Sequence, residues 1–171
     1  YKWHRINPGT PFISNSKSNN NDYGKMPYDW GCVFPSAPVF VDDEIRIYYG
    51  ASDWYFFDWR KGGLALATLD KNRWAGYEQD NNFQPAVVTT VPINLSNKIY
   101  ISAEVQFQGS VNVGILDENG NKVKGSRTIT KSCTDLEISL KEIIEESSND
   151  ELRVQFTLSK SKIYSFSIRK R

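Results

Sequence analysis

Short stretches of alternating apolar and polar residues, separated by turn residues, run along most of the chain. In Glu44–Gly50, the side chains of Ile45, Ile47 and Tyr49 alternate with polar or small residues, which is the period-two pattern of a strand with one buried face. Gly63–Leu69 is apolar on both faces and small at alternate positions, as a strand enclosed between two layers would be. We therefore expect two neighbouring strands joined by the loop between them.

The same signals recur at the roughly 8- to 12-residue spacing of antiparallel β proteins, so we expect an all-β fold. The strands expected before residue 82 are Val33–Val41, Glu44–Gly50, Gly63–Leu69 and Arg73–Glu78. The strands expected after it are Val87–Ile93, Lys98–Phe107, Val111–Leu116, Lys122–Lys131, Leu136–Leu140, Leu152–Leu158 and Lys162–Ile168. Asp42–Asp43 and Asp117–Gly120 have the composition of tight turns, the second with glycine at the strained position. Only Lys141–Ser147 looks helical, and it is short.

A change of pattern near residue 82 divides the chain into two expected units. Residues 1–82 begin with a long turn-rich stretch, whereas residues 83–171 carry regularly spaced strands. Asp80, Asn81 and Asn82 form the expected joint, because Asp and Asn favour turns. A chain of 171 residues with 39% apolar residues can form one large domain or two small ones.

The composition narrows the classes of partner and site. The net charge is +1, from 21 basic and 20 acidic residues, so we expect neither a nucleic acid nor an anionic membrane as partner. No apolar run approaches the roughly 18 residues of a membrane-spanning helix. Cys32, Cys133 and the single histidine, His4, show no metal-binding spacing, so we expect no metal and no cofactor. We expect two unpaired, mostly buried thiols, and a disulfide between them stays open as the alternative.

Two stretches of sequence carry a family resemblance. The run "YYGASD" at Tyr48–Asp53, an aromatic loop, and "GLALATL" at Gly63–Leu69 together resemble the last blade of the five-bladed β-propellers of glycoside hydrolase families 32, 43 and their relatives. The run "INLSNKIYISAEVQFQGSVNVGILDENGNKVKG" at Ile93–Gly125, with "KIYSFSI" at Lys162–Ile168, resembles the β-sandwich that follows the propeller in some bacterial glycosidase-like proteins. The resemblance implies a final propeller blade in residues 1–82, followed by an antiparallel β-sandwich in residues 83–171.

The resemblance also implies a function. Such proteins cleave glycosidic bonds with a pair of carboxylates, and in these families the pair comes from earlier blades. We therefore assign no catalytic residue and expect this chain alone to be inactive. The resemblance implies that the chain is the C-terminal part of a longer carbohydrate-active protein, and that this parent is a glycosidase. The implied partners are carbohydrate and either the missing blades of the parent chain or a second copy. The implied location is secreted or periplasmic.

Five residues are the expected substrate-binding set: Asp29, Trp30, Asp53, Trp54 and Arg60. Asp29–Gly31 matches the "D-x-G" that opens the inner strand of the last blade, and Asp53 ends the "YYGASD" strand. Arg60 matches a position at which relatives carry a basic residue. Carboxylates accept hydrogen bonds from sugar hydroxyls, and a tryptophan face stacks on the apolar face of a sugar ring.

Other interpretations of the same residues stay open. Asp53 could cap a turn, since aspartate readily bonds its own backbone, and the aromatic loop could serve packing. The chain could also be a non-catalytic carbohydrate-binding module or a protein-interaction module, because aromatic rows serve both kinds of contact. Exposure of Trp54 and Trp59 beside Asp and Arg would favour sugar binding, whereas burial against Val or Leu would favour packing.

Overall fold

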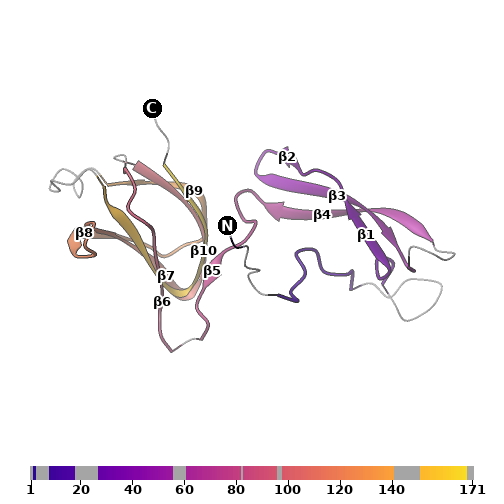
Figure 1. The fold of residues 1–171 in the computed structure, drawn as a ribbon, viewed down its shortest axis with the longest axis horizontal. Coiled ribbons are helices and arrows are strands. Elements are labelled where there is room, and N and C mark those ends of the chain that lie inside the picture. The colour runs from indigo at the N-terminus through magenta and orange to yellow at the C-terminus, as the bar shows by residue number, and fades with distance from the viewer. Residues whose placement is uncertain are drawn as a thin grey trace. The chain divides into compact units, whose positions relative to one another are not determined.

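The computed structural model describes residues 2, 8–17, 27–55, 61–81, 83–95, 98–140 and 151–168. The part it describes contains ten strands and no helix, and all the strand pairs are antiparallel (Figure 1). The all-β prediction is therefore confirmed, while the expected helix Lys141–Ser147 lies outside the described residues. The chain divides into two compact units, Tyr1–Asp70 and Lys71–Arg171, which we call the first unit and the second unit.

The first unit is built around one central strand. Its strands are β1 (Cys32–Pro35), β2 (Val39–Val41), β3 (Glu44–Ser52) and β4 (Gly62–Asp70). β3 pairs with β4 on one edge and with both β1 and β2 on the other. The last β1 pair is Pro35 with Tyr49, and the first β2 pair is Val39 with Arg46. Between these two pairs, the edge strand has one residue more than β3. The expected strand Val33–Val41 is thus interrupted, because Pro38 has no N–H to give to the ladder.

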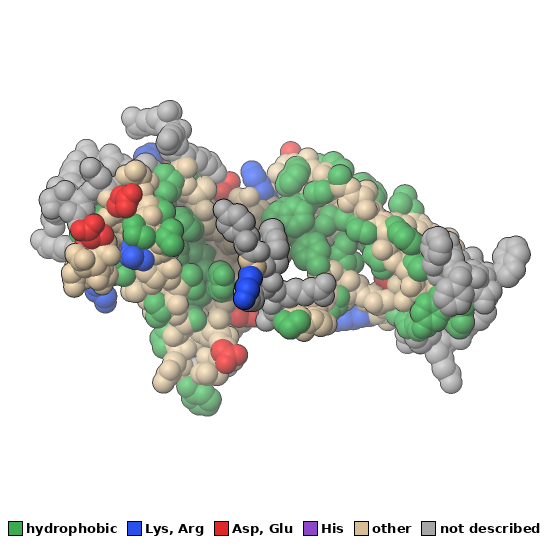
Figure 2. Space-filling view, in the orientation of Figure 1, with side chains coloured by type: hydrophobic (Ala, Val, Ile, Leu, Met, Phe, Trp, Pro, Cys, Tyr) green, Lys and Arg blue, Asp and Glu red, His purple; other side chains and the backbone are tan. Residues whose placement is uncertain are grey.

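The two faces of this sheet differ in their burial. Ile45, Ile47, Tyr49 and Ala51 point to one face and are at most 5% exposed, as the alternating pattern predicted. Paired residues share a face, so the register assigns a second set to the opposite face: Phe34, Val39, Tyr48, Leu64 and Leu66. All five are exposed, and Figure 2 shows hydrophobic side chains at the surface over this sheet. The expected enclosure of β4 on both faces is not seen, since Leu64 is 78% exposed.

The second unit is a six-stranded sheet with two long central strands. Its strands are β5 (Tyr77–Glu78), β6 (Ala86–Thr89), β7 (Lys98–Leu116), β8 (Lys122–Ile129), β9 (Cys133–Ser139) and β10 (Arg153–Ser167). β7 and β10 pair with each other along most of their length. β5 and β6 lie on the outer edge of β10, and β8 and β9 lie on the outer edge of β7. The two strands expected between Lys98 and Leu116 are therefore the single strand β7. The two strands expected between Leu152 and Ile168 are likewise the single strand β10.

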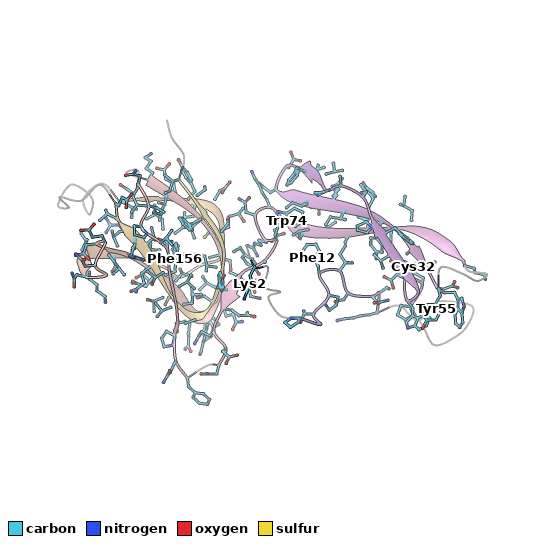
Figure 3. All side chains as sticks on the ribbon, in the orientation of Figure 1. Lys2, Phe12, Cys32, Tyr55, Trp74 and Phe156 are labelled. Carbon is cyan, nitrogen blue, oxygen red and sulfur yellow. The ribbon has the colours of Figure 1, made fainter. Side chains whose placement is uncertain are left out.

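A bend halfway along β7 and β10 gives the second unit a single core. Ser159 of β10 pairs with Ser110 of β7, and Ser161 pairs with Val105. Between these two pairs, β10 has one residue, Lys160, whereas β7 has four. Gly109 lies in this bulge, and a Cβ there would overlap the backbone oxygen of Lys160. Figure 1 shows both strands curving strongly. Apolar residues from both halves of the two strands, including Phe156 (Figure 3), belong to one buried cluster.

The segment after β4 belongs to the second unit. Tyr77 and Glu78 pair with β10, and the Asn72 side chain donates to the Asp135 carboxylate at 2.9 Å. The expected strand Arg73–Glu78 is therefore not a fourth strand of the first sheet; only its last two residues are extended, and they pair in the second. The contacts divide the chain after Asp70, twelve residues before the joint expected at residue 82.

Candidate functional site

Three aromatic side chains cluster at one end of the first unit. Trp30 precedes β1, and Trp54 and Tyr55 follow β3, whose end pairs with the start of β1. The ring centroids of Trp30 and Trp54 are 5.8 Å apart, those of Trp30 and Tyr55 are 5.0 Å apart, and those of Trp54 and Tyr55 are 5.7 Å apart. Figure 3 shows Tyr55 and the β1 residue Cys32 at this end of the sheet. The residues Trp30, Trp54 and Tyr55 are called the aromatic cluster below.

The aromatic cluster is open to solvent. Trp54 is 42% exposed, Tyr55 is 46% exposed and Trp30 is half-buried. The rings pack on one another, and the contacts between Tyr55 and its two neighbours are edge-to-face. Such contacts are worth about 0.5–1.5 kcal/mol beyond burial, so the rings support each other while keeping part of their surface accessible.

The backbone under the aromatic cluster is closely packed. The Gly31 N–H donates to the Ser52 carbonyl at 2.8 Å, and the Ser52 hydroxyl donates to the Trp54 carbonyl at 2.9 Å. The Gly31 Cα faces the backbone of Trp54 so closely that a Cβ would overlap it. Glycine is therefore required at position 31 if Trp30 and Trp54 are to meet. The Cys32 thiol also lies 3.7 Å from the Trp54 carbonyl oxygen.

Asp53 closes the base of the loop that follows β3. Its side chain is buried, at 4% exposure, and its carboxylate accepts a hydrogen bond from the Lys61 N–H at 2.8 Å. Its own N–H donates to the Lys61 carbonyl at 3.2 Å. These two bonds join the residues at the two ends of the loop, which is the turn-closing role that aspartate favours.

Asp29 joins the N-terminal segment to β3. It is 1% exposed, and both of its carboxylate oxygens accept a hydrogen bond from the Ser16 N–H, each at 2.9 Å. The Tyr49 hydroxyl donates to the same carboxylate at 3.2 Å and lies 3.1 Å from the Tyr28 hydroxyl. Burial, together with Tyr28 and Asp29, raises the pKa of Tyr49 well above its usual range. A buried carboxylate with this many donors is held for structure.

The structure brings together part of the expected binding set. Trp30 and Trp54 meet at the aromatic cluster, whereas the buried carboxylates of Asp29 and Asp53 hold the chain beside it. Arg60 and Trp59 lie outside the described residues. Tyr55 was missing from the expected set, although its place next to Trp54 in an aromatic run is a signal for it. Gly31 was expected only as part of a motif, and its packing role could not be read from the sequence.

A groove lies on the second unit, between β8 and β9. This open groove has a volume of about 480 Å³ and is lined by residues of both strands and of the turn that joins them. Its lining includes Arg127, Lys131, Cys133 and Glu137 but no aromatic ring, so it offers no stacking surface for a sugar. Burial raises the pKa of the Cys133 thiol, which disfavours the reactive thiolate. Both Cys32 and Cys133 are free and half-buried.

The described residues form neither a metal-ligand cluster nor a membrane-spanning helix. Within the described ranges, no group of three or more His, Cys, Asp or Glu residues is placed to hold a metal ion. In that same part of the chain, no helix is long and apolar enough to cross a membrane. Compared with known proteins, the chain matches no family model, no curated protein and no solved structure.

Proposed function

We propose that this chain is the carbohydrate-binding C-terminal part of a glycoside-hydrolase-like protein, and that the aromatic cluster contacts the sugar. The observation that carries the proposal is the exposure of Trp54 and Tyr55, whose rings contact Trp30 and each other. Exposed aromatic rings at the end of a rigid sheet are a common form of ligand site, because the scaffold holds them and the loops leave them accessible.

Asp29 and Asp53 act in this proposal as positioning residues. Both carboxylates are buried and accept backbone hydrogen bonds, so neither is available to receive sugar hydroxyls. Asp29 holds the segment before Trp30, and Asp53 closes the loop that carries Trp54 and Tyr55. Sites whose supporting residues are themselves locked keep their geometry in the absence of ligand. The proposal therefore assigns sugar contact to the rings and orientation of the rings to the carboxylates.

The wider part of the proposal rests on the sequence resemblance and on the all-β fold. The parent is a secreted or periplasmic glycosidase, its catalytic carboxylates come from other blades, and this chain supplies a sugar-contacting loop and an accessory β domain. The buried state of Asp29 and Asp53 supports the view that neither belongs to a catalytic acid–base pair, since both carboxylates are committed to backbone donors.

Titration of the purified chain with a panel of monosaccharides and oligosaccharides, followed by tryptophan fluorescence and calorimetry, tests the proposal. We expect Trp54→Ala to weaken binding by roughly three- to tenfold, the loss of about one stacking contact. Trp74→Ala is the matched control, because Trp74 is similarly exposed, at 40%, and lies in the second unit. The same preparation should hydrolyse no aryl glycoside.

Two results would contradict the proposal. In the first, both Trp54→Ala and Trp74→Ala bind every sugar as the unmodified chain does, and only Trp54→Ala lowers the thermal midpoint. The aromatic cluster would then serve packing and not sugar binding. The other is turnover of an aryl glycoside that a substitution within this chain abolishes.

A second function, association with protein, is favoured by a separate observation. The face of the first sheet that carries Phe34, Leu64 and Leu66 is exposed in the described structure. Contiguous apolar surface of this kind commonly marks a protein interface. We propose that this face contacts either other blades of the parent chain or a second copy of this chain.

A further inference from the structure

We infer that the second unit carries a ligand site of its own at the bend of β7 and β10, and that the site takes a neutral, hydroxyl-rich ligand of the carbohydrate class. The site consists of residues 79–81 and 83–84, which connect β5 to β6, and of residues 106–109 in the β7 bulge. These residues are called the corner below. The inference goes beyond the proposed function, because it uses no residue of the aromatic cluster.

Both parts of the corner are fixed to one residue of β10, Lys160. The Lys160 N–H donates to the side-chain oxygen of Gln79, which directly follows β5. Gly109 of β7 approaches the Lys160 carbonyl so closely that a Cβ on Gly109 would overlap it. β5 and β7 pair with opposite edges of β10, so the corner spans this strand at the bend. Figure 1 shows the connection between β5 and β6 projecting beside the bend.

Hydrogen bonds hold the connection between β5 and β6 in a defined shape. The Gln79 Nε2 donates to the carbonyl of Asn81 at 3.1 Å and to that of Gln84 at 2.8 Å. The Phe83 N–H donates to the Asn81 side-chain oxygen at 3.0 Å. Phe83 itself is 93% exposed. The loop is therefore ordered by its polar groups, and its aromatic ring adds almost no burial to the fold.

The β7 bulge presents a second exposed ring. Phe107 is 88% exposed and lies between Gln106 and Gln108. Gln108 has a positive φ of 58°, which residues other than glycine adopt infrequently and which is enriched at ligand sites. Among the described residues, Phe83 and Phe107 are the two most exposed large apolar side chains, and both lie at the corner. Their joint placement on two ordered segments indicates a ligand surface.

The polar side chains next to the two phenylalanines indicate the ligand class. Gln84, Gln106 and Gln108 are exposed, and each amide both donates and accepts hydrogen bonds. Sugar hydroxyls do the same, while an aromatic ring stacks on the apolar face of a sugar. Asp80 in the corner and Lys160 beside it contribute one charge of each sign, so the corner favours a neutral ligand.

Two other ligand classes fit the corner less well. A loop that inserts into a membrane surface carries several basic residues around its aromatic rings, whereas Lys160 is the basic residue at this bend. A protein interface has a contiguous apolar centre, whereas Gln84, Gln106 and Gln108 adjoin the two phenylalanines in the chain. Isolated rings among amides favour a sugar over both alternatives.

Calorimetric titration of the whole chain with neutral oligosaccharides of glucose, mannose, galactose, xylose and fructose tests the inference. We expect Phe83→Ala and Phe107→Ala each to weaken the binding of one and the same sugar by roughly three- to tenfold, the loss of about one stacking contact. Phe83→Tyr, which restores a ring, should recover the affinity that Phe83→Ala loses. The affinity should not change between about 0.05 and 0.5 M salt, because a neutral ligand forms no ion pair.

Exposure of the two rings makes the variants interpretable. Neither Phe83→Ala nor Phe107→Ala should lower the thermal midpoint, since neither ring is buried. Val91→Ala is the control, because Val91 is 71% exposed in the same unit. Its neighbour Thr90 bonds the backbone of Val154 at the start of β10, away from the bend.

Comparison with Trp54→Ala separates this inference from the proposed function. Binding that Phe83→Ala and Phe107→Ala weaken, and that Trp54→Ala leaves unchanged, would support the corner. Sugar binding weakened by Trp54→Ala but by neither phenylalanine variant would overturn this inference and leave the proposed function intact. Binding to vesicles of phosphatidylcholine and phosphatidylglycerol that Phe83→Ala abolishes, with no sugar bound at the corner, would overturn it in favour of a membrane ligand. Failure to bind any sugar would overturn both.

Discussion

At the scale of single residues, buried polar side chains connect the segments of the first unit. Tyr49 lies on the covered face of β3 and links Asp29 and Tyr28 through its hydroxyl. Asp29 in turn binds the backbone of Ser16. This chain of contacts ties the irregular N-terminal segment to the sheet, so a change at Tyr49 affects both the sheet and the segment that leads to the aromatic cluster.

The raised pKa of Tyr49 predicts a loss of stability at alkaline pH. An unfolded tyrosine ionises near pH 10, whereas folded Tyr49 keeps its proton to higher pH. Its contribution to the free energy of unfolding is fully present below about pH 10 and is lost above it, by up to about 1.4 kcal/mol per pH unit. Denaturation of Tyr49→Phe between about pH 8 and 11 should therefore show a shallower alkaline decline than the unmodified chain.

The same variant should be less stable at about pH 8, by about 1–3 kcal/mol, because Asp29 loses a buried donor. Tyr77→Phe is the control, since Tyr77 is 59% exposed. Parallel alkaline declines in Tyr49→Phe and the unmodified chain would show that the Tyr49 hydroxyl is not responsible.

At the scale of elements, the bend shared by β7 and β10 organises the second unit. Both strands continue through it, and the apolar residues on either side of it meet in one core. Gln108 and Lys160 take positive φ angles of 58° and 44° at this point. Bulges of this kind bend a strand and increase its twist, which lets one sheet cover its own core.

Gly109→Ala should destabilise the second unit. A Cβ at position 109 would overlap the backbone oxygen of Lys160, which cannot move without shifting β10. We expect a loss of about 1–3 kcal/mol in the free energy of unfolding, measured with urea. Gly114→Ala, in the same strand, is the matched control, because the nearest atom to its Cβ would be the Gln155 carbonyl oxygen at 4.0 Å. Equal effects of the two substitutions would contradict the proposed role of the bend.

At the scale of the whole molecule, exposed apolar surface and an edge of β4 that pairs with no other described strand favour association. β4 is a regular nine-residue strand that pairs with β3 on one edge. Its residues Leu64 and Leu66 lie on the exposed face of the sheet. Edge strands with neither proline nor inward-pointing charge readily pair with another chain. The isolated chain should therefore associate with a second copy when no parent blade is present.

Light scattering over a range of concentrations measures this association. We expect a mass that rises with concentration, and a shift toward the monomer in the double variant Leu64→Lys, Leu66→Lys. Phe83→Lys is the control, because Phe83 is 93% exposed but lies on a loop of the second unit. A chain that stays monomeric at high concentration and binds no apolar dye would count against the association.

The sequence by itself determined the features that depend on neighbours along the chain. The alternation in Glu44–Gly50 identified β3 and its buried face, because side chains on a strand point alternately to opposite sides. The turn at Asp117–Gly120 was predicted from its residues, and Gly120 indeed has a positive φ of 87°. The all-β class followed from the repetition of such local signals.

Only the tertiary structure decided the features that depend on distant partners. The sequence showed that Asp29 and Asp53 are carboxylates near tryptophans, but their bonds to Ser16 and Lys61 made them buried supports rather than exposed acceptors. Likewise, the strand pattern of Arg73–Glu78 fits either unit, and the pairing of its last two residues, Tyr77 and Glu78, with β10 assigned it to the second. Hydrogen bonds and register between segments far apart in the chain leave no local pattern, because they arise when those segments meet in the folded state.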